Sequence, residues 1–158
     1  MARNTMENLR TTGDQTVKPV LDDGIREAED IRSDIDSVKD QLEGMPELDP
    51  ELTSAIESVG ATAKDEARRD VERVMRDKIE VGRRNAENIK SQVDSNIRDN
   101  DTARGRLDSI RSKYASTEIN TAKSAIDSNS QYGEMTKSDL DQALENAVSR
   151  VNDLLAGI

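Results

Sequence analysis

The sequence predicts an all-α fold, an elongated coiled-coil hairpin or bundle in which antiparallel helices fold back on a long central helix at both ends. Apolar residues recur at steps of three and four, which places them on one face of a helix. All three prolines lie in the first 50 of the 158 residues, and the chain contains no Phe or Trp. Because aromatic residues usually supply much of the buried area of a compact core, their absence favours narrow helical seams.

The composition also limits the chemistry of the chain. It has no Cys and no His, which removes disulfides, thiolate metal sites and the commonest general base near neutral pH. No window approaches the ~20 apolar residues of a membrane span, and no apolar run follows the N-terminal Met. We therefore expect a soluble, cytoplasmic protein, with export by a route without a cleaved signal left open. The net charge of −10 disfavours nucleic acid as a partner.

Residues 1–13 are polar and are expected to form a mobile arm or a short helical turn, before a single elongated helical domain over residues 14–158. The first helix is expected at about 17–43. It should end at Gly44 and Pro46, since glycine suits the left-handed position that closes a helix and proline prevents continuation. Its apolar residues form a coiled-coil seam from Ala28 onward. The seam residues are Ile25, Ala28, Ile31, Ile35, Val38 and Leu42.

The central helix is expected at about 50–127. Asp49 can cap its free backbone N–H groups, and Pro50 suits the first helical position. Its stripe consists of Leu52, Ile56, Val59, Ala63, Ala67, Val71, Val74, Ile79, Ala86, Ile89, Val93 and Ile97. Because the link between the two helices is short, they are expected to be antiparallel neighbours, with the first helix lying along residues 52–81.

Three points in the central helix are weak by sequence. The stripe thins to alanine over residues 61–67, and Gly82 costs about 1 kcal/mol against alanine, which points to close packing or a bend. The third point is the polar cluster over residues 99–105, which can cap a new helix or lie within an old one. A continuous helix and a break near 99–105 both stay open. Asn100 lies near a seam position, where a buried Asn can set register.

The last helix is expected at about 137–156. Residues 128–133 have the composition of a loop, and Thr136 is a candidate cap. The apolar face of this helix includes Leu140, Leu144, Val148, Val151 and Leu155. Neighbouring apolar pairs widen this face, so either more than one helix covers it or its outer edge is an interaction surface. A short loop should fold the helix back on residues 105–127.

Charge is unevenly distributed along the chain. Residues 1–63 hold 6 basic and 15 acidic residues, residues 64–113 hold 14 and 11, and residues 114–158 hold 3 and 7. A mildly basic middle between acidic ends favours a fold in which the ends return to the centre. The basic run over residues 64–84 lacks aromatic residues that would stack on bases. We expect it to form a salt-bridged face that meets the acidic first helix, which contains Glu27, Asp30 and Asp34.

The sequence contains no motif for catalysis or for a cofactor, and we expect no enzyme activity, no cofactor and no bound metal. The acidic cluster over residues 99–108 fits a capping role better than a calcium loop, because Arg104 stands where that loop needs glycine. Paired carboxylates such as Asp22 and Asp23 are expected on solvated helix faces, since a catalytic pair needs a partly dry pocket to separate its pKa values.

The sequence therefore favours a non-enzymatic structural, assembly or adaptor protein. It would act through coiled-coil self-association or by binding another helical protein. The alternative is a secretion-associated small helical partner or targeting module of an exported effector, leaderless and type VII-like. The W-x-G turn typical of such helical hairpins is absent, because the chain has no Trp.

Overall fold

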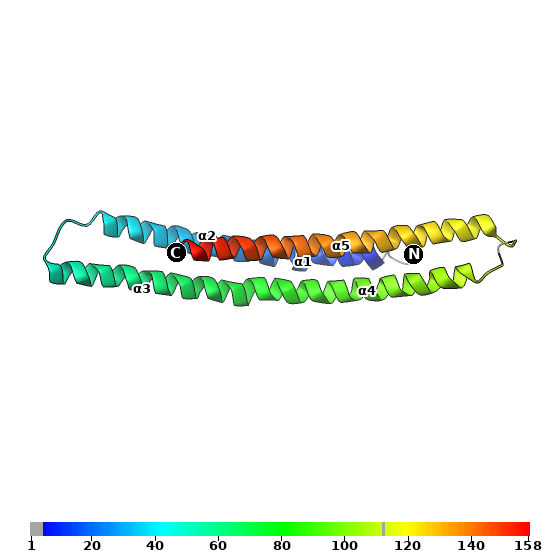
Figure 1. Cartoon of the computed structure of the whole chain (residues 1–158), viewed down its shortest axis with the longest axis horizontal. Helices are drawn as coiled ribbons and strands as arrows, with labels where there is room; N and C mark the ends of the chain where they lie inside the picture. Colours follow the sequence, from blue (N-terminus) through cyan, green and yellow to red (C-terminus); the bar gives the residue numbers. More distant parts are fainter. Residues whose placement is uncertain (1–4, 112) are drawn as a thin grey trace. The chain divides into compact units, whose positions relative to one another are not determined.

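A computed structural model describes residues 5–111 and 113–158, and within these ranges the chain is all-α, as predicted (Figure 1). Its elements are α1 (Thr5–Thr16), α2 (Lys18–Glu43), α3 (Pro50–Val74), the π-turn η1 (Met75–Ile79), α4 (Glu80–Asp108) and α5 (Ser116–Ala156). The chain divides into two compact units. The first consists of the residues up to Lys18 with Arg83–Ala143, and the second of Pro19–Gly82 with Leu144–Ile158. The grouping of residues 14–158 into one domain stays a prediction.

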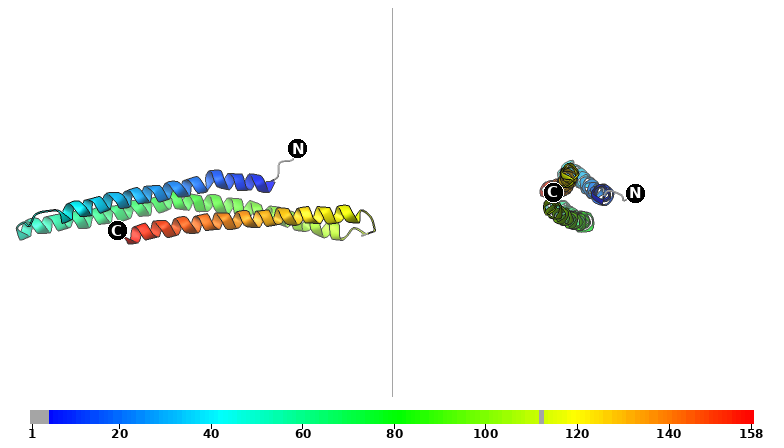
Figure 2. Two further views of the ribbon diagram at one scale, coloured as in Figure 1. Left: turned by 90° about the horizontal axis from the view of Figure 1, so that it is seen from above. Right: turned by 90° about the vertical axis from the view of Figure 1, so that its right-hand side faces the viewer.

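In the second unit α2 lies antiparallel to α3, as predicted. A Cβ on Gly60, near the start of α3, would lie 3.1 Å from Leu42 near the end of α2. Gly82 lies in the first turn of α4, which follows α3 and η1, and a Cβ on it would lie 2.6 Å from Leu21 near the start of α2. Figure 2 shows the two helices side by side, joined by the loop over residues 44–49. The antiparallel pairing therefore extends along most of both helices.

α2 ends and α3 begins where the sequence predicts, but the predicted caps, a left-handed Gly44 and the side chain of Asp49, are not formed. α2 ends at Glu43 and α3 begins at Pro50. Asp49 makes no side-chain capping bond, and its carbonyl oxygen accepts hydrogen bonds from the backbone of α3 instead. Gly44 is not left-handed, because no described glycine has a positive φ. Its backbone N–H continues the helical pattern by donating to Asp40 O at 3.1 Å.

The last residues of α5 form the third helical segment of this unit and run parallel to α2. Arg32 Nη1 donates to Leu154 O at 3.2 Å, and Lys39 Nζ donates to Ile158 O at 3.3 Å. The last carbonyl groups of an α-helix have no partner within the helix, and its C-terminal end carries partial negative charge. The two cations of α2 therefore satisfy carbonyl groups at the end of α5.

The π-turn η1 keeps the stripe of α3 on one side of the helix. Val74 and Ile79 are five residues apart, whereas the preceding members of the stripe, from Leu52 to Val74, are three or four apart. A π-turn takes in one additional residue, and both side chains are buried, at 6% and 2% exposed. The π-turn was not predicted from the sequence. Its sequence signal is the five-residue step from Val74 to Ile79.

In the first unit α5 runs antiparallel to α4. Lys90 pairs with Asp141 at 2.7 Å, and Arg104 pairs with Asp127 at 2.8 Å. The central helix ends at Asp108, so its predicted extension to residue 127 is wrong. Of the two alternatives left open at residues 99–105, the continuous helix is the one observed, because these residues are helical within α4.

The predicted N-terminal arm over residues 1–13 is wrong in its described part, which lies in helix α1; residues 1–4 of the arm lie outside the described residues. The buried residues of α1 are Met6, Leu9 and Gly13. A Cβ on Gly13 would lie 2.9 Å from Leu140 Cδ2. Gly13 therefore permits contact between α1 and α5.

A polar layer joins α4 to α5 in the first unit. Asn100 Nδ2 donates to Asn129 Oδ1 at 2.9 Å and to Ser130 Oγ at 3.0 Å. Asn96 Nδ2 donates to the same Asn129 oxygen at 3.4 Å. These side chains bond across the two helices, so they neither cap a helix nor interrupt one.

α5 is continuous through the predicted loop at residues 128–133, and it begins at Ser116, not near residue 137. Thr136 does not cap a helix, because it is buried within α5 and its hydroxyl donates to Tyr132 O at 2.9 Å. The first part of α5 lies along α4, which ends at Asp108. The predicted pairing of residues 137–156 with residues 105–127 is therefore wrong.

Replacing Gly82 by alanine should destabilise the protein, although alanine is favoured over glycine in a helix by about 1 kcal/mol. The new Cβ would lie 2.6 Å from Leu21 Cδ2 and 3.0 Å from its Cγ, and Leu21 is only 2% exposed, so this side chain has little room to move. Gly105→Ala in α4 is the matched control, because no atom lies within 4 Å of its Cβ. It should raise the unfolding midpoint measured by circular dichroism. A raised midpoint for Gly82→Ala as well would contradict the close contact.

The polar layer should fix the pairing of α4 with α5 at a cost in stability. Asn100→Leu alone should lower the unfolding midpoint, because Asn129 loses a donor in a half-buried position. Combining it with Asn129→Leu should restore or exceed the wild-type midpoint, since apolar side chains then replace both polar partners. Thermal unfolding of both variants tests this. A double variant that unfolds at or below the temperature of Asn100→Leu would show that the layer stabilises the fold.

Candidate interaction surface

The seam residues predicted from the sequence pack within the chain. Ala28, Ile35, Leu140 and Val151 are at most 4% exposed. The others are half-buried: Ile25, Ile31, Val38, Leu42, Leu144, Val148 and Leu155. Their burial is intramolecular, and their role toward a partner stays a prediction.

The stripe of α3 passes from buried to exposed toward the start of the helix. Val71 and Val74 are 0% and 6% exposed, whereas Leu52 and Val59 are 52% and 55% exposed. The spacing of three and four continues through Ala63, so all these residues lie toward one side of the helix. The apolar stripe therefore extends beyond the part that the chain itself covers.

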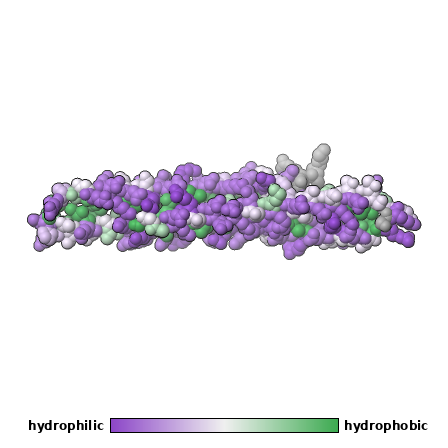
Figure 3. Space-filling model, turned by 45° about the horizontal axis from the view of Figure 1, so that its top comes forward, coloured by the Kyte–Doolittle hydropathy of each residue, from purple (hydrophilic) through white to green (hydrophobic). Residues whose placement is uncertain are grey.

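The loop between α2 and α3 adds two exposed apolar side chains, Met45 and Leu48, which are 48% and 38% exposed. We refer to residues 42–60 as the α2–α3 tip. Its charged residues are Glu43, Glu47, Asp49, Glu51 and Glu57, and it contains no Lys or Arg. Figure 3 shows apolar residues among polar ones toward the place where α2 and α3 are joined. The tip combines exposed apolar side chains with charge of one sign.

A groove of about 200 Å³ lies between α2 and α3. It is lined by Ile31, Asp34, Ile35 and Val38 of α2 and by Ala63, Glu66, Ala67 and Asp70 of α3. Every charged residue in this lining is acidic, and we call it the acidic groove. Asp70 lies 3.5 Å from Arg73 on its own helix. Within the described part of the chain, Asp34 and Glu66 form no ion pair.

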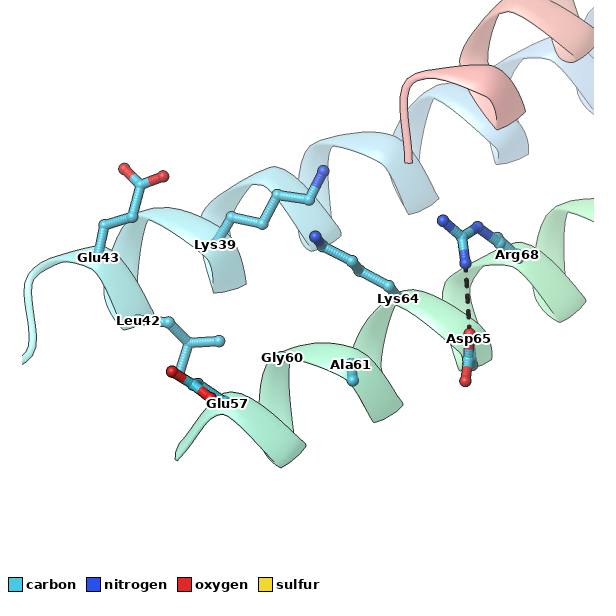
Figure 4. Close-up of a pocket in the computed structure, with 9 residues that line it drawn as sticks. All are labelled: Lys39, Leu42, Glu43, Glu57, Gly60, Ala61, Lys64, Asp65 and Arg68. Carbon is cyan, nitrogen blue, oxygen red and sulfur yellow. Dashed lines mark hydrogen bonds and ion pairs between the residues drawn. The ribbon is translucent and has the colours of Figure 1, made fainter. Parts of the chain in front are cut away.

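A second groove, of about 460 Å³, also lies between α2 and α3 and carries charges of both signs (Figure 4). It is lined by Lys39, Leu42, Glu43, Glu57, Gly60, Ala61, Lys64, Asp65 and Arg68. Figure 4 shows Lys64 extending from α3 toward α2. Arg68 donates to Asp65 at 3.3 Å, and Lys39 donates to the carbonyl oxygen of Ile158. Several charges of this groove are therefore already paired within the chain.

The basic run over residues 64–84 meets α2 through fewer charges than the sequence predicts. Lys78 Nζ lies 3.9 Å from Glu27 Oε1, as expected for a salt-bridged face. Asp30 and Asp34 form no ion pair with any described residue, although Asp34 lines a groove together with Glu66 and Asp70 of α3. Exposed ion pairs contribute little to stability, and the pairing of α2 with α3 depends mainly on apolar contacts.

The carboxylates with shifted pKa values lie on exposed helix surfaces of the first unit. Lys137 Nζ donates to Asp94 Oδ1 at 2.6 Å, and this hydrogen bond lowers the pKa of Asp94. A hydrogen bond from Lys123 lowers the pKa of Asp108 in the same way. A general acid at neutral pH needs a carboxyl group with a raised pKa, which is the opposite shift. Within the described ranges, no group of three or more acidic residues is arranged to hold a metal ion.

Comparisons with protein-family models, with curated proteins and with solved structures find no match to this chain. None of the helices in the described residues is long and apolar enough to cross a membrane. A functional conclusion therefore depends on the chemistry of the surface of α2 and α3.

Leu52 and Val59 belong to the stripe predicted from the sequence, but their exposure was not predicted. A signal was present in the sequence, because residues 42–60 contain acidic residues and no basic ones. Such a segment contains no Lys or Arg that could form an ion pair and hold a neighbouring helix over the apolar stripe. The acidic groove had no sequence signal, since it depends on the pairing of two helices.

Proposed function

We propose that this protein is a non-enzymatic helical adaptor that binds a protein partner along α2 and α3. The observation that carries the proposal is the change in side-chain exposure along the apolar stripe of α3, from the buried Val71 to the exposed Leu52 and Val59. A helix face with partly exposed apolar residues is a surface that a further helix can cover. Binding of a different protein and self-association through this stripe are both forms of this function.

The size of the exposed apolar surface indicates how strong such binding is. Covering the exposed halves of Met45, Leu48, Leu52 and Val59 contributes about 1 kcal/mol for each side chain. The sum of about 4 kcal/mol corresponds to a dissociation constant near 1 mM. Association also costs translational and side-chain entropy, so specific binding needs further contacts beside these four residues. The grooves between α2 and α3 are the adjoining surfaces that can supply them.

The double variant Leu52→Ser with Val59→Ser tests the proposal in the full chain. Both side chains are more than half exposed, so the variant should keep its helicity and its unfolding midpoint. Met135→Ser is the matched control, because Met135 is 64% exposed and lies in the other unit. Affinity capture from the source cells and light scattering measure association with other proteins and with further copies. The wild type and Met135→Ser should share an association that the double variant lacks.

Two results would count against the adaptor function. The three chains could capture the same proteins and have the same molar mass, which would show that the stripe is not a binding surface. The double variant could instead lose helicity or unfold at a lower temperature. In that case the exposed residues would serve the fold of this chain.

A further inference from the structure

We propose that the partner of this surface is a basic amphipathic helix, which lies over the acidic groove with its apolar residues on the groove floor and its Lys and Arg side chains on the rims. This partner class rests on the proposed function. It follows from the position of the groove, from the charge of its rims and from the way α5 already binds α2.

The acidic groove and the exposed stripe belong to one face of α3. Leu52, Val59, Ala63, Glu66 and Asp70 are separated by seven, four, three and four residues. These separations return to the same side of an α-helix, so the five residues form one row. A helix that covers the groove therefore also reaches the exposed apolar residues.

The floor of the groove is apolar and its rims are negative. Ile35 and Ala67 are buried on the floor, at 4% and 8% exposed. Asp34 of α2 and Glu66 of α3 line the same groove from opposite helices, and neither forms an ion pair within the described residues. Unpaired carboxylates on both sides of an apolar floor complement a helix that carries an apolar row between basic side chains.

The chain itself provides an example of a helix bound to α2 through cations and carboxylates. Arg150 of α5 lies 3.4 Å from Glu29 of α2. Arg32 of α2 also donates to the carbonyl oxygen of Leu154 near the end of α5. Basic groups therefore hold the end of α5 against α2, whereas Asp34 and Glu66 at the acidic groove have no basic partner among the described residues.

A second copy of this chain is a poor fit to the same face. A twofold interface places a surface against itself, and each residue then meets residues of its own patch. The charged residues of the α2–α3 tip and of the acidic groove are all acidic. Such an interface would bring carboxylates together, which opposes association. A partner with basic residues removes this repulsion.

Synthetic helical peptides of about five turns are suitable probes, since a helix of this length spans the row from Leu52 to Asp70. The first peptide has one Leu and Ile face with Lys and Arg on its other faces. The second has the same composition in scrambled order, so that its apolar residues share no face. The third keeps the apolar face and replaces Lys and Arg by Glu. Fluorescence anisotropy with the full chain should show binding of the first peptide about tenfold tighter than that of the second, and no binding of the third.

Variants of the full chain locate the binding face. Asp34→Asn with Glu66→Gln should weaken binding of the first peptide about tenfold, because two charge pairs are lost. Asp101→Asn with Glu87→Gln is the matched control, since it makes the same charge change at exposed positions of α4. Leu52→Ser with Val59→Ser should also weaken binding. Equal binding of the first two peptides, or equal effects of the two charge variants, would overturn the proposal in favour of unspecific attraction between opposite charges.

The proposed function and this partner class fail in different ways. If association of the full chain does not depend on Leu52 and Val59, the adaptor function is wrong. If that association exists but the first peptide shows no preference over the others, the function stands and the basic helix is wrong. A dimer in light scattering that Leu52→Ser with Val59→Ser dissociates would assign the face to a second copy and would also overturn the proposal.

Discussion

Contact between glycine and a large aliphatic side chain is the constraint on which the packing of both units depends. The chain has no Phe or Trp, so its narrow seams are closed by bringing helices close together. Glycine lacks a Cβ, and a neighbouring helix can approach its backbone directly. The same type of contact occurs in both units: Gly13 with Leu140, Gly133 with Met6, Gly24 with Ile79 and Gly82 with Leu21.

This type of packing also explains where the chain leaves its seam uncovered. Leu42 with Gly60 is the glycine contact between the two residues that bound the α2–α3 tip. Beyond it the two helices separate into the loop, and Leu52 on α3 becomes 52% exposed. The stripe therefore stabilises the fold where helices meet closely and is available for binding where they do not. The proposed adaptor function uses the same apolar row that forms the core of the unit.

Much of the fold could be predicted from periodicity, and the failures share one physical cause. The 3–4 spacing predicted the all-α class, Gly44 and Pro46 predicted the end of α2, and the short link predicted its antiparallel pairing with α3. In α5 the same spacing runs through Ile126, Asn129, Gly133, Thr136 and Leu140, of which only Ile126 and Leu140 are large apolar residues, so an apolar pattern alone does not predict one continuous helix. Asn129 is a seam residue because it pairs with Asn100, a partner in another helix that no local pattern shows. The acidic groove was unpredictable for a similar reason, since it depends on the pairing of α2 with α3.

Hydrogen–deuterium exchange along α3 tests most directly whether one stripe is covered at one end and open at the other. Local opening is easiest where few apolar contacts hold a helix. Amides of residues 67–74 should exchange slowly, because Val71 and Val74 are buried, whereas amides of residues 52–59 should exchange much faster. Equal protection along the whole of α3 in the isolated chain would contradict the account, since the tip would then already be covered and would not be free to bind a partner.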